Sequence, residues 1–261
     1  MLIVISPAKT LDYESALPNV RATQPRMLDQ SEELVNQLRE LSSLDIAGLM
    51  HVSDKIASLN ATRFSQWSRP FDKANARPAL FAFMGDVYTG LAVRDFSPDE
   101  LLQAQHRLRI LSGLYGVLRP LDLMQPYRLE MGTRLLNDRG KDLYAFWDMT
   151  ITDSLNKDLR AAKTDVLVNL ASNEYFRSVK TKQLNGQIIT PVFHDEKNGK
   201  FKVISFFAKK ARGLMAAWII QNNVTDAAKL TEFNVSGYRY SAQDSNGDNM
   251  VFRRKEKDLP K

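Results

Sequence analysis

The stretch Leu2-Ile3-Val4-Ile5-Ser6-Pro7-Ala8-Lys9-Thr10 places a short apolar run directly before a polar turn. The run Leu2–Ile5 predicts a buried strand, because a short apolar run that ends at a turn signal is typical of one. In open α/β sheets, ligands bind beyond the carboxyl ends of the strands. The hydroxyl groups of Ser6 and Thr10 and the ammonium group of Lys9 would suit an anion there. A plain surface loop explains the same residues, and both interpretations stay open.

Strands and helices alternate along the early part of the chain, and hairpins follow near its end. Ser97-Pro98-Asp99-Glu100 predicts a helix start with Ser97 as the N-cap, and Asn198-Gly199 predicts a tight hairpin turn. We therefore expect a mixed α/β fold: a single domain over residues 1–261, with a mixed twisted sheet surrounded by helices. The further strands that we expect are Ala79–Phe83, Arg109–Leu111, Asp165–Leu170, Ile188–Phe193, Lys200–Phe207, Tyr238–Tyr240 and Met250–Arg254, and the main helices are Met27–Leu41, two within Asp45–Trp67, Asp142–Lys157 and Lys209–Gln221.

Composition excludes several classes of site. The chain has 261 residues, of which 44% are hydrophobic and 25% charged, close to a globular average. It has no cysteine, which excludes disulfides, thiolate metal sites and a cysteine nucleophile. The three histidines show no metal-binding spacing, and no Walker A, dinucleotide-binding or nucleophile-elbow motif occurs. We expect no metal and no cofactor.

The apolar run at Met1–Ile5 has neither the basic residues nor the cleavage site of a signal peptide. Nowhere does the chain approach the roughly 20 apolar residues of a membrane helix. We expect a cytoplasmic protein with no membrane partner.

Positive charge is concentrated in one segment. The whole chain has a formal net charge of +6, but between Arg177 and Gly213 nine lysines and arginines face only Asp195 and Glu196. Such a cluster indicates an anionic partner, such as nucleic acid, a nucleotide or phosphate. A solvated strand pair and helix that happen to carry lysines would look the same.

Polar and glycine-rich turns follow several of the expected strands, which suggests that they line one cleft. Arg119 and Arg128 stand near prolines, and arginines on such a rigid backbone suit phosphate or carboxylate groups. Surface ion pairs with neighbouring acids explain them equally. The residues in these turns that could act as acid or base are Asp86, Glu130 and Glu174, and those that could supply a hydroxyl group are Ser6, Ser112 and Ser172.

The break between the two short helices of residues 45–67 resembles a helix-hairpin-helix motif. Leu49, Val52 and Ile56 occupy its apolar positions, and Lys55 its basic position. Such a hairpin directs backbone N–H groups and a helix N-terminus at one phosphate, and Ser53 is a good N-cap. His51 and Ser53 stand where the motif usually has glycine, so an ordinary helix corner remains an alternative.

Together these stretches resemble the YaaA family of bacterial peroxide-stress proteins. The matching stretches are Ile5–Asp12, Ser53–Lys55, Gly85–Leu91, Ser112–Met131, Asn169–Ser172 and Ile204–Gly213. The resemblance implies a peroxide-stress protein that binds double-stranded DNA non-specifically through the hairpin and a basic cleft. It also implies low free intracellular iron and less oxidative damage to DNA and protein. Carried onto this chain, the DNA- or anion-binding residues are Lys9, His51, Ser53, Lys55, Arg119, Arg128, Lys180, Lys182, Lys209, Lys210 and Arg212.

A second hypothesis is an enzyme that acts on a nucleotide, a nucleobase or another small anionic substrate. The Gly-, Ser-, Tyr- and Arg-containing turns suit a pocket better than a duplex-binding face. The resemblance brings no catalytic residues, so the choice among the candidate acids and hydroxyl groups stays open. Direct iron binding is disfavoured, because His194 beside Asp195 and Glu196 is the closest approach to a ligand set.

Overall fold

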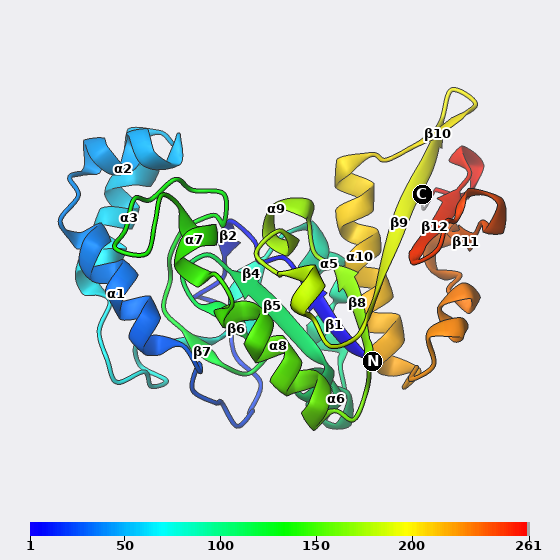
Figure 1. Ribbon diagram of the computed structural model, residues 1–261, viewed down its shortest axis with the longest axis horizontal. Coiled ribbons are helices and arrows are strands. Elements are labelled where there is room, and N and C mark those ends of the chain that lie inside the picture. Colours follow the sequence, from blue (N-terminus) through cyan, green and yellow to red (C-terminus); the bar gives the residue numbers. More distant parts are fainter. Residues whose placement is uncertain (260–261) are drawn as a thin grey trace.

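A sheet of eight strands runs through the molecule in the computed structural model, which describes residues 1–259 (Figure 1). At its centre β1 (Leu2–Ile5) pairs in parallel with β5 (Leu108–Ser112) on one side and β8 (Val166–Leu170) on the other. All four residues of β1 are buried. The predicted buried first strand is confirmed, and a strand flanked on both sides explains its continuous apolar sequence.

Beyond β8 the sheet continues in parallel with β9 (Gln187–Lys197) and β12 (Asn249–Arg254). Its remaining strands are antiparallel to their neighbours, so the sheet is mixed, as expected. These are β6 (Gly116–Leu118), β10 (Lys200–Lys202) and β11 (Arg239–Tyr240). Two small pairs lie apart: β2 (Thr10–Leu11) with β4 (Phe83–Met84), and β3 (Arg77–Pro78) with β7 (Leu123–Met124).

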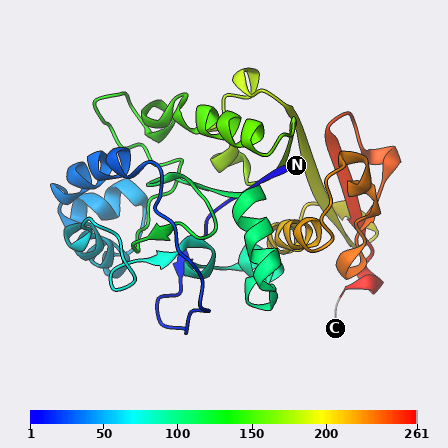
Figure 2. The same ribbon diagram turned by 90° about the horizontal axis from the view of Figure 1, so that it is seen from below.

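Helices cover both faces of the sheet. Figure 2 shows α8 on one side, and α6 and α10 on the other. The helix α6 starts with the predicted capping box, in which the Ser97 hydroxyl accepts from the Glu100 N–H group. The α-helices are α1 (Leu28–Arg39), α2 (Ser43–Met50), α3 (Asp54–Gln66), α4 (Ala79–Ala82), α5 (Asp86–Leu91), α6 (Pro98–Arg107), α7 (Leu143–Trp147), α8 (Thr150–Ala161), α9 (Asn173–Phe176) and α10 (Ser205–Gln221).

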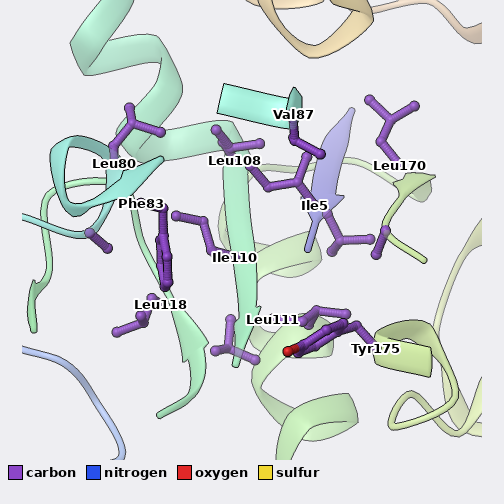
Figure 3. Packing of buried hydrophobic residues seen from close by; sticks show 14 of the residues in the cluster. Ile5, Leu80, Phe83, Val87, Leu108, Ile110, Leu111, Leu118, Leu170 and Tyr175 are labelled. Carbon is purple, nitrogen blue, oxygen red and sulfur yellow. The ribbon is translucent and has the colours of Figure 1, made fainter. Parts of the chain in front are cut away.

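The core forms where the central strands meet α5. Ile5, Ile110 and Leu170 come from three neighbouring strands and pack near Val87 of α5 (Figure 3). All four are at most 8% exposed. Because β1 is held between β5 and β8, the turns that follow these strands emerge at the same edge of the sheet.

Three predicted elements differ. Ala79–Phe83 is not a strand: residues 79–82 form α4, whose four side chains are all buried, and such a run fits a buried helix turn or a strand equally. The predicted strand Lys200–Phe207 ends at Lys202, and α10 begins at Ser205, because the packing of this helix outweighs the strand preference of its aromatic residues. The helix over Asp142–Lys157 is interrupted at Asp148, where φ is +32°.

Candidate anion-binding site

The turns after β1 and β8 are joined by two serines. The Ser172 backbone N–H donates to Ser6 Oγ over 2.8 Å, and the Ser6 hydroxyl lies 3.3 Å from Ser172 Oγ. Tyr88 of α5 donates its hydroxyl to the Ser6 carbonyl oxygen over 3.2 Å. Ser172 is also the N-cap of α9. Three segments that are far apart in the sequence therefore meet at the carboxyl edge of the parallel strands.

A cavity of about 400 Å³ opens at this junction. Its volume lies within the range of small-molecule sites. Ser6, Ser172 and Tyr88 line it, together with three cations: Lys9 from the turn after β1, and Lys209 and Arg212 from α10. The turns that begin at Ser6, Gly85 and Ser172 line this cavity together with three of the predicted cations, whereas no residue of Ser112–Met131 lines it.

Arg212 is the most unusual charge in this cavity. Its side chain is partly buried, and this burial lowers the pKa of its guanidinium group, with no carboxylate acting in the opposite direction. A cation that has lost water without gaining a counter-ion is stabilised by any anion that reaches it. Arg212 thus lies in the wall of this cavity as a partly buried cation.

Lys9 and Arg128 share one carboxylate, that of Glu130, and all three line a small neighbouring cavity. Lys9 Nζ lies 3.1 Å from Glu130 Oε1, and Arg128 Nη2 lies 3.0 Å from the same oxygen. Glu130 Oε2 is buried and has no hydrogen-bond partner within residues 1–259. The sequence suggested Glu130 as an acid or base, but its contacts make it a counter-ion to two predicted cations.

The position of Lys209 and Arg212 depends on a close crossing of α5 and α10. A Cβ atom on Gly90 of α5 would overlap the Lys210 carbonyl oxygen, and one on Gly213 of α10 would overlap that of Val87. Only glycine lets the two backbones approach this closely. The crossing holds Tyr88 on one helix and Arg212 on the other along the wall of one cavity.

The other cations predicted for a cleft lie outside this cavity. Arg119 forms an ion pair with the fully buried Asp122 over 2.8 Å, and Lys180 lies 3.5 Å from Asp148. Lys182 belongs to a short 3₁₀ turn, and Lys210 lines a separate cavity. The prediction of one cleft for all these cations is not supported. Lys9, Lys209 and Arg212 line the cavity described above, and Arg128 lines a small neighbouring cavity with Lys9 and Glu130.

The two helices predicted within residues 45–67 form, as α2 and α3, and they meet at a corner at a distance from this site. His51 follows α2 with φ +51°, the left-handed conformation that glycine usually adopts in such turns. Ser53 occupies the N-cap position of α3, as expected, although its side chain makes no capping hydrogen bond. Lys55 is exposed in the first turn of α3. Both views place α2 and α3 at the end of the long axis opposite β10 (Figures 1 and 2).

The remaining candidate acids and hydroxyl groups have different surroundings. Ser112 is fully buried and lies 2.5 Å from the Tyr127 hydroxyl, so it is a structural group. Glu174 lines the cavity, and its Oε1 accepts from the Gly132 N–H group over 3.0 Å. Asp86 lines the cavity at the start of α5. The sequence did not indicate that Tyr88 lines the cavity and binds the Ser6 carbonyl oxygen, although Tyr88 lies within the glycine-rich turn Gly85–Gly90.

In the part of the chain that the structure describes, no helix is long and apolar enough to cross a membrane. Over the same residues, no three histidine, aspartate or glutamate side chains gather as a metal site would require.

Comparison with known proteins gives one consistent family. Residues 1–244 match a family model described as peroxide stress protein YaaA. The chain is 67% identical over 256 residues to a UPF0246 protein of Alcanivorax borkumensis, covering 98% of this chain and 99% of the relative. It is 58% identical over 256 residues to a UPF0246 protein of Saccharophagus degradans, covering 98% of this chain and 100% of that relative.

Proposed function

The chain belongs to the family of peroxide stress protein YaaA, and from that premise we propose that it protects the cell during peroxide stress by binding double-stranded DNA non-specifically. Such binding would act on the phosphate backbone, which carries no sequence information by itself. DNA of a bacterium lies in the cytoplasm, and the protein would work there.

The observation that carries this proposal is the conformation of the α2–α3 hairpin. His51 adopts the left-handed turn despite its side chain, so the corner has the tight form that a phosphate-binding hairpin needs. The first N–H groups of a helix lack partners within it, and the Ser53 side chain does not accept from them in α3. These N–H groups and the exposed Lys55 are therefore free to bind a phosphate oxygen.

The test is a titration of the protein into two unrelated fluorescent DNA duplexes over a series of salt concentrations. We expect similar affinities for both, and an affinity that falls steeply with salt because phosphate binding releases counter-ions. Lys55→Ala should weaken binding to both duplexes and lower the log–log salt slope by about one. Lys157→Ala, at an exposed lysine of α8, is the matched control and should leave both unchanged. Absence of binding at low salt would refute the proposal.

We also propose that the protein helps to keep free intracellular iron low and limits oxidative damage, as the family resemblance implies. No ligand set for iron is part of this proposal. A strain without the protein should contain more chelatable iron after peroxide treatment, as measured by electron paramagnetic resonance of whole cells. Equal iron levels in the two strains would contradict it.

A second candidate function is binding of, or catalysis on, a small anionic ligand such as a nucleotide in the 400 Å³ cavity. Arg212 favours it, because a partly buried cation without a counter-ion suits a ligand phosphate. Ser6 and Ser172 add hydroxyl groups nearby, and Asp86 adds a carboxylate. Arg212→Ala should abolish nucleotide binding, measured by calorimetry, while duplex binding through Lys55 persists. If Arg212→Ala instead abolished duplex binding and left nucleotide binding unchanged, the cavity would be assigned to DNA.

A further inference from the structure

A second cavity, of about 310 Å³, lies along the opposite face of α10 from Arg212. Phe207, Lys210 and Leu214 line it, whereas Lys209 and Arg212 line the first cavity. Residues three and four apart share a face of a helix, so the two sets point in different directions. The second cavity is therefore a separate space, and its occupancy can be tested independently of the first.

One of its lining residues is a buried arginine, Arg254, with a donor that has no acceptor among the described residues. Arg254 is 4% exposed, and its Nε donates to Asp195 Oδ1 over 2.7 Å. The guanidinium carbon lies 4.7 Å from the ring centre of Phe207 and 4.4 Å from that of Tyr238. Nη2 has no hydrogen-bond partner among residues 1–259. A buried donor without an acceptor is costly, so an acceptor supplied by a ligand would be favoured here.

The cavity also combines positive charge with an apolar wall. Lys210 is its second cation, and no aspartate or glutamate lines it within the described residues. Phe206, at the start of α10, lines it as well and is 54% exposed, so its ring is accessible to a ligand. A ligand with one charged end and one apolar end would match these two features.

We propose that this cavity is a binding site for a small molecule in which an anionic group is attached to an aromatic or apolar body. The anionic group contacts Lys210 and Arg254, and the body packs on Phe206. Neither the hairpin nor Arg212 belongs to this site, so it can be tested independently of the proposed DNA binding.

The test is a calorimetric titration of the whole chain with phenyl phosphate. Inorganic phosphate and phenol, which supply the two halves of that probe, are titrated in parallel. We expect saturable binding of one phenyl phosphate, and binding of each half at least about tenfold weaker. Phe206→Ala and Lys210→Gln should each weaken phenyl phosphate binding by about tenfold, since a charge-assisted contact or an aromatic contact is of that size.

Lys157→Gln is the matched control, because it removes one exposed charge from α8, outside both cavities, and Lys209→Gln reports on the first cavity. Circular dichroism melts establish that each variant is folded. Binding that survives Phe206→Ala and Lys210→Gln but is lost in Lys209→Gln or Arg212→Gln would place the probe in the first cavity and overturn the inference. No binding by the folded chain, or equal affinity for inorganic phosphate, would overturn it too.

Discussion

Gly213 on α10 lies so close to Val87 on α5 that a Cβ atom would overlap the Val87 carbonyl oxygen. Gly90 stands in the same relation to the Lys210 carbonyl oxygen, so each glycine faces the backbone of the other helix. This crossing decides where Arg212 lies relative to the turn after β1. A small change at the crossing should therefore affect both stability and the cavity.

Gly213→Ala should lower the free energy of unfolding by about 1–3 kcal/mol, because the added methyl group must push two backbones apart. Urea unfolding measures this effect. Gly48→Ala is the control: nothing lies within 4 Å of a Cβ at that position of α2, and alanine favours a helix. We expect Gly48→Ala to be neutral or stabilising. Equal losses in the two variants would mean that the crossing is not tight.

The free energy of unfolding should depend on pH through the carboxyl group of Asp158. Burial alone would raise the pKa of its carboxyl group, but hydrogen bonds from Arg109 and Arg26 outweigh this, and the pKa is lowered from its usual 3.8. A lowered pKa means that the folded state favours the carboxylate, so this stabilisation is present above pH 3.8 and is lost as pH falls through the folded pKa.

Asp158→Asn should lower the free energy of unfolding by about 3–5 kcal/mol near neutral pH, because it leaves the buried Arg109 without its counter-ion. Urea unfolding from pH 7 down to pH 3 checks both effects. The variant should also lose less stability than the wild type between these limits. An equal loss with pH in both proteins would contradict the assignment to Asp158.

Glu130→Gln should strengthen anion binding in the first cavity. Glu130 now neutralises part of the charge of Lys9 and Arg128, and the substitution removes that competition. We expect the affinity for adenosine triphosphate to rise by roughly fivefold, or about 1 kcal/mol, in low-salt calorimetry. Glu40→Gln makes the same charge change at the exposed end of α1 and should have no effect. Weaker binding in Glu130→Gln would show that this carboxylate orients the two cations for the ligand.

Asp54→Asn should strengthen duplex binding through the hairpin. Asp54 is exposed in the first turn of α3, beside Lys55, and repels the phosphate that would bind there. We expect an affinity gain of roughly fivefold at low salt, corresponding to about 1 kcal/mol. Asp153→Asn, in the first turn of α8, is the matched control. If both substitutions give the same gain, general charge and not the hairpin determines binding.

The sequence predicted an element correctly where a single local pattern, such as an apolar run or a capping box, was unambiguous. Leu2–Ile5 and Asp165–Leu170 are continuous apolar runs with clear turn signals, and both contain strands of the parallel centre. Ser97 and Glu100 form the capping box that their spacing predicts. Ala79–Phe83 was wrong because four buried apolar residues carry no periodicity that separates a helix turn from a strand.

For the site, the sequence predicted which types of residue take part, but not which of these residues line the cavity. Lys9 and Arg212 were selected for their charge, and both line the cavity, but so were Arg119 and Lys180, which face acids outside it. The pair of Arg119 with Asp122, three residues further on, was one of the two interpretations that the sequence left open. The pair of Lys180 with Asp148 joins distant segments and leaves no trace in local sequence. The unused donor of Arg254 was equally invisible, because it depends on which acceptors fail to reach it.

By itself, the sequence determined the fold class, the central buried strand, the break between two helices near His51 and the high density of positive charge between Arg177 and Gly213. Each of these can be predicted from patterns of residues that are close together in the chain. Only the tertiary structure decided which cations are free and which are paired, and that α10 presents Arg212 to one cavity and Lys210 to another. Charge acts through space over a few ångströms, so its effect is set by packing between segments and not by order along the chain.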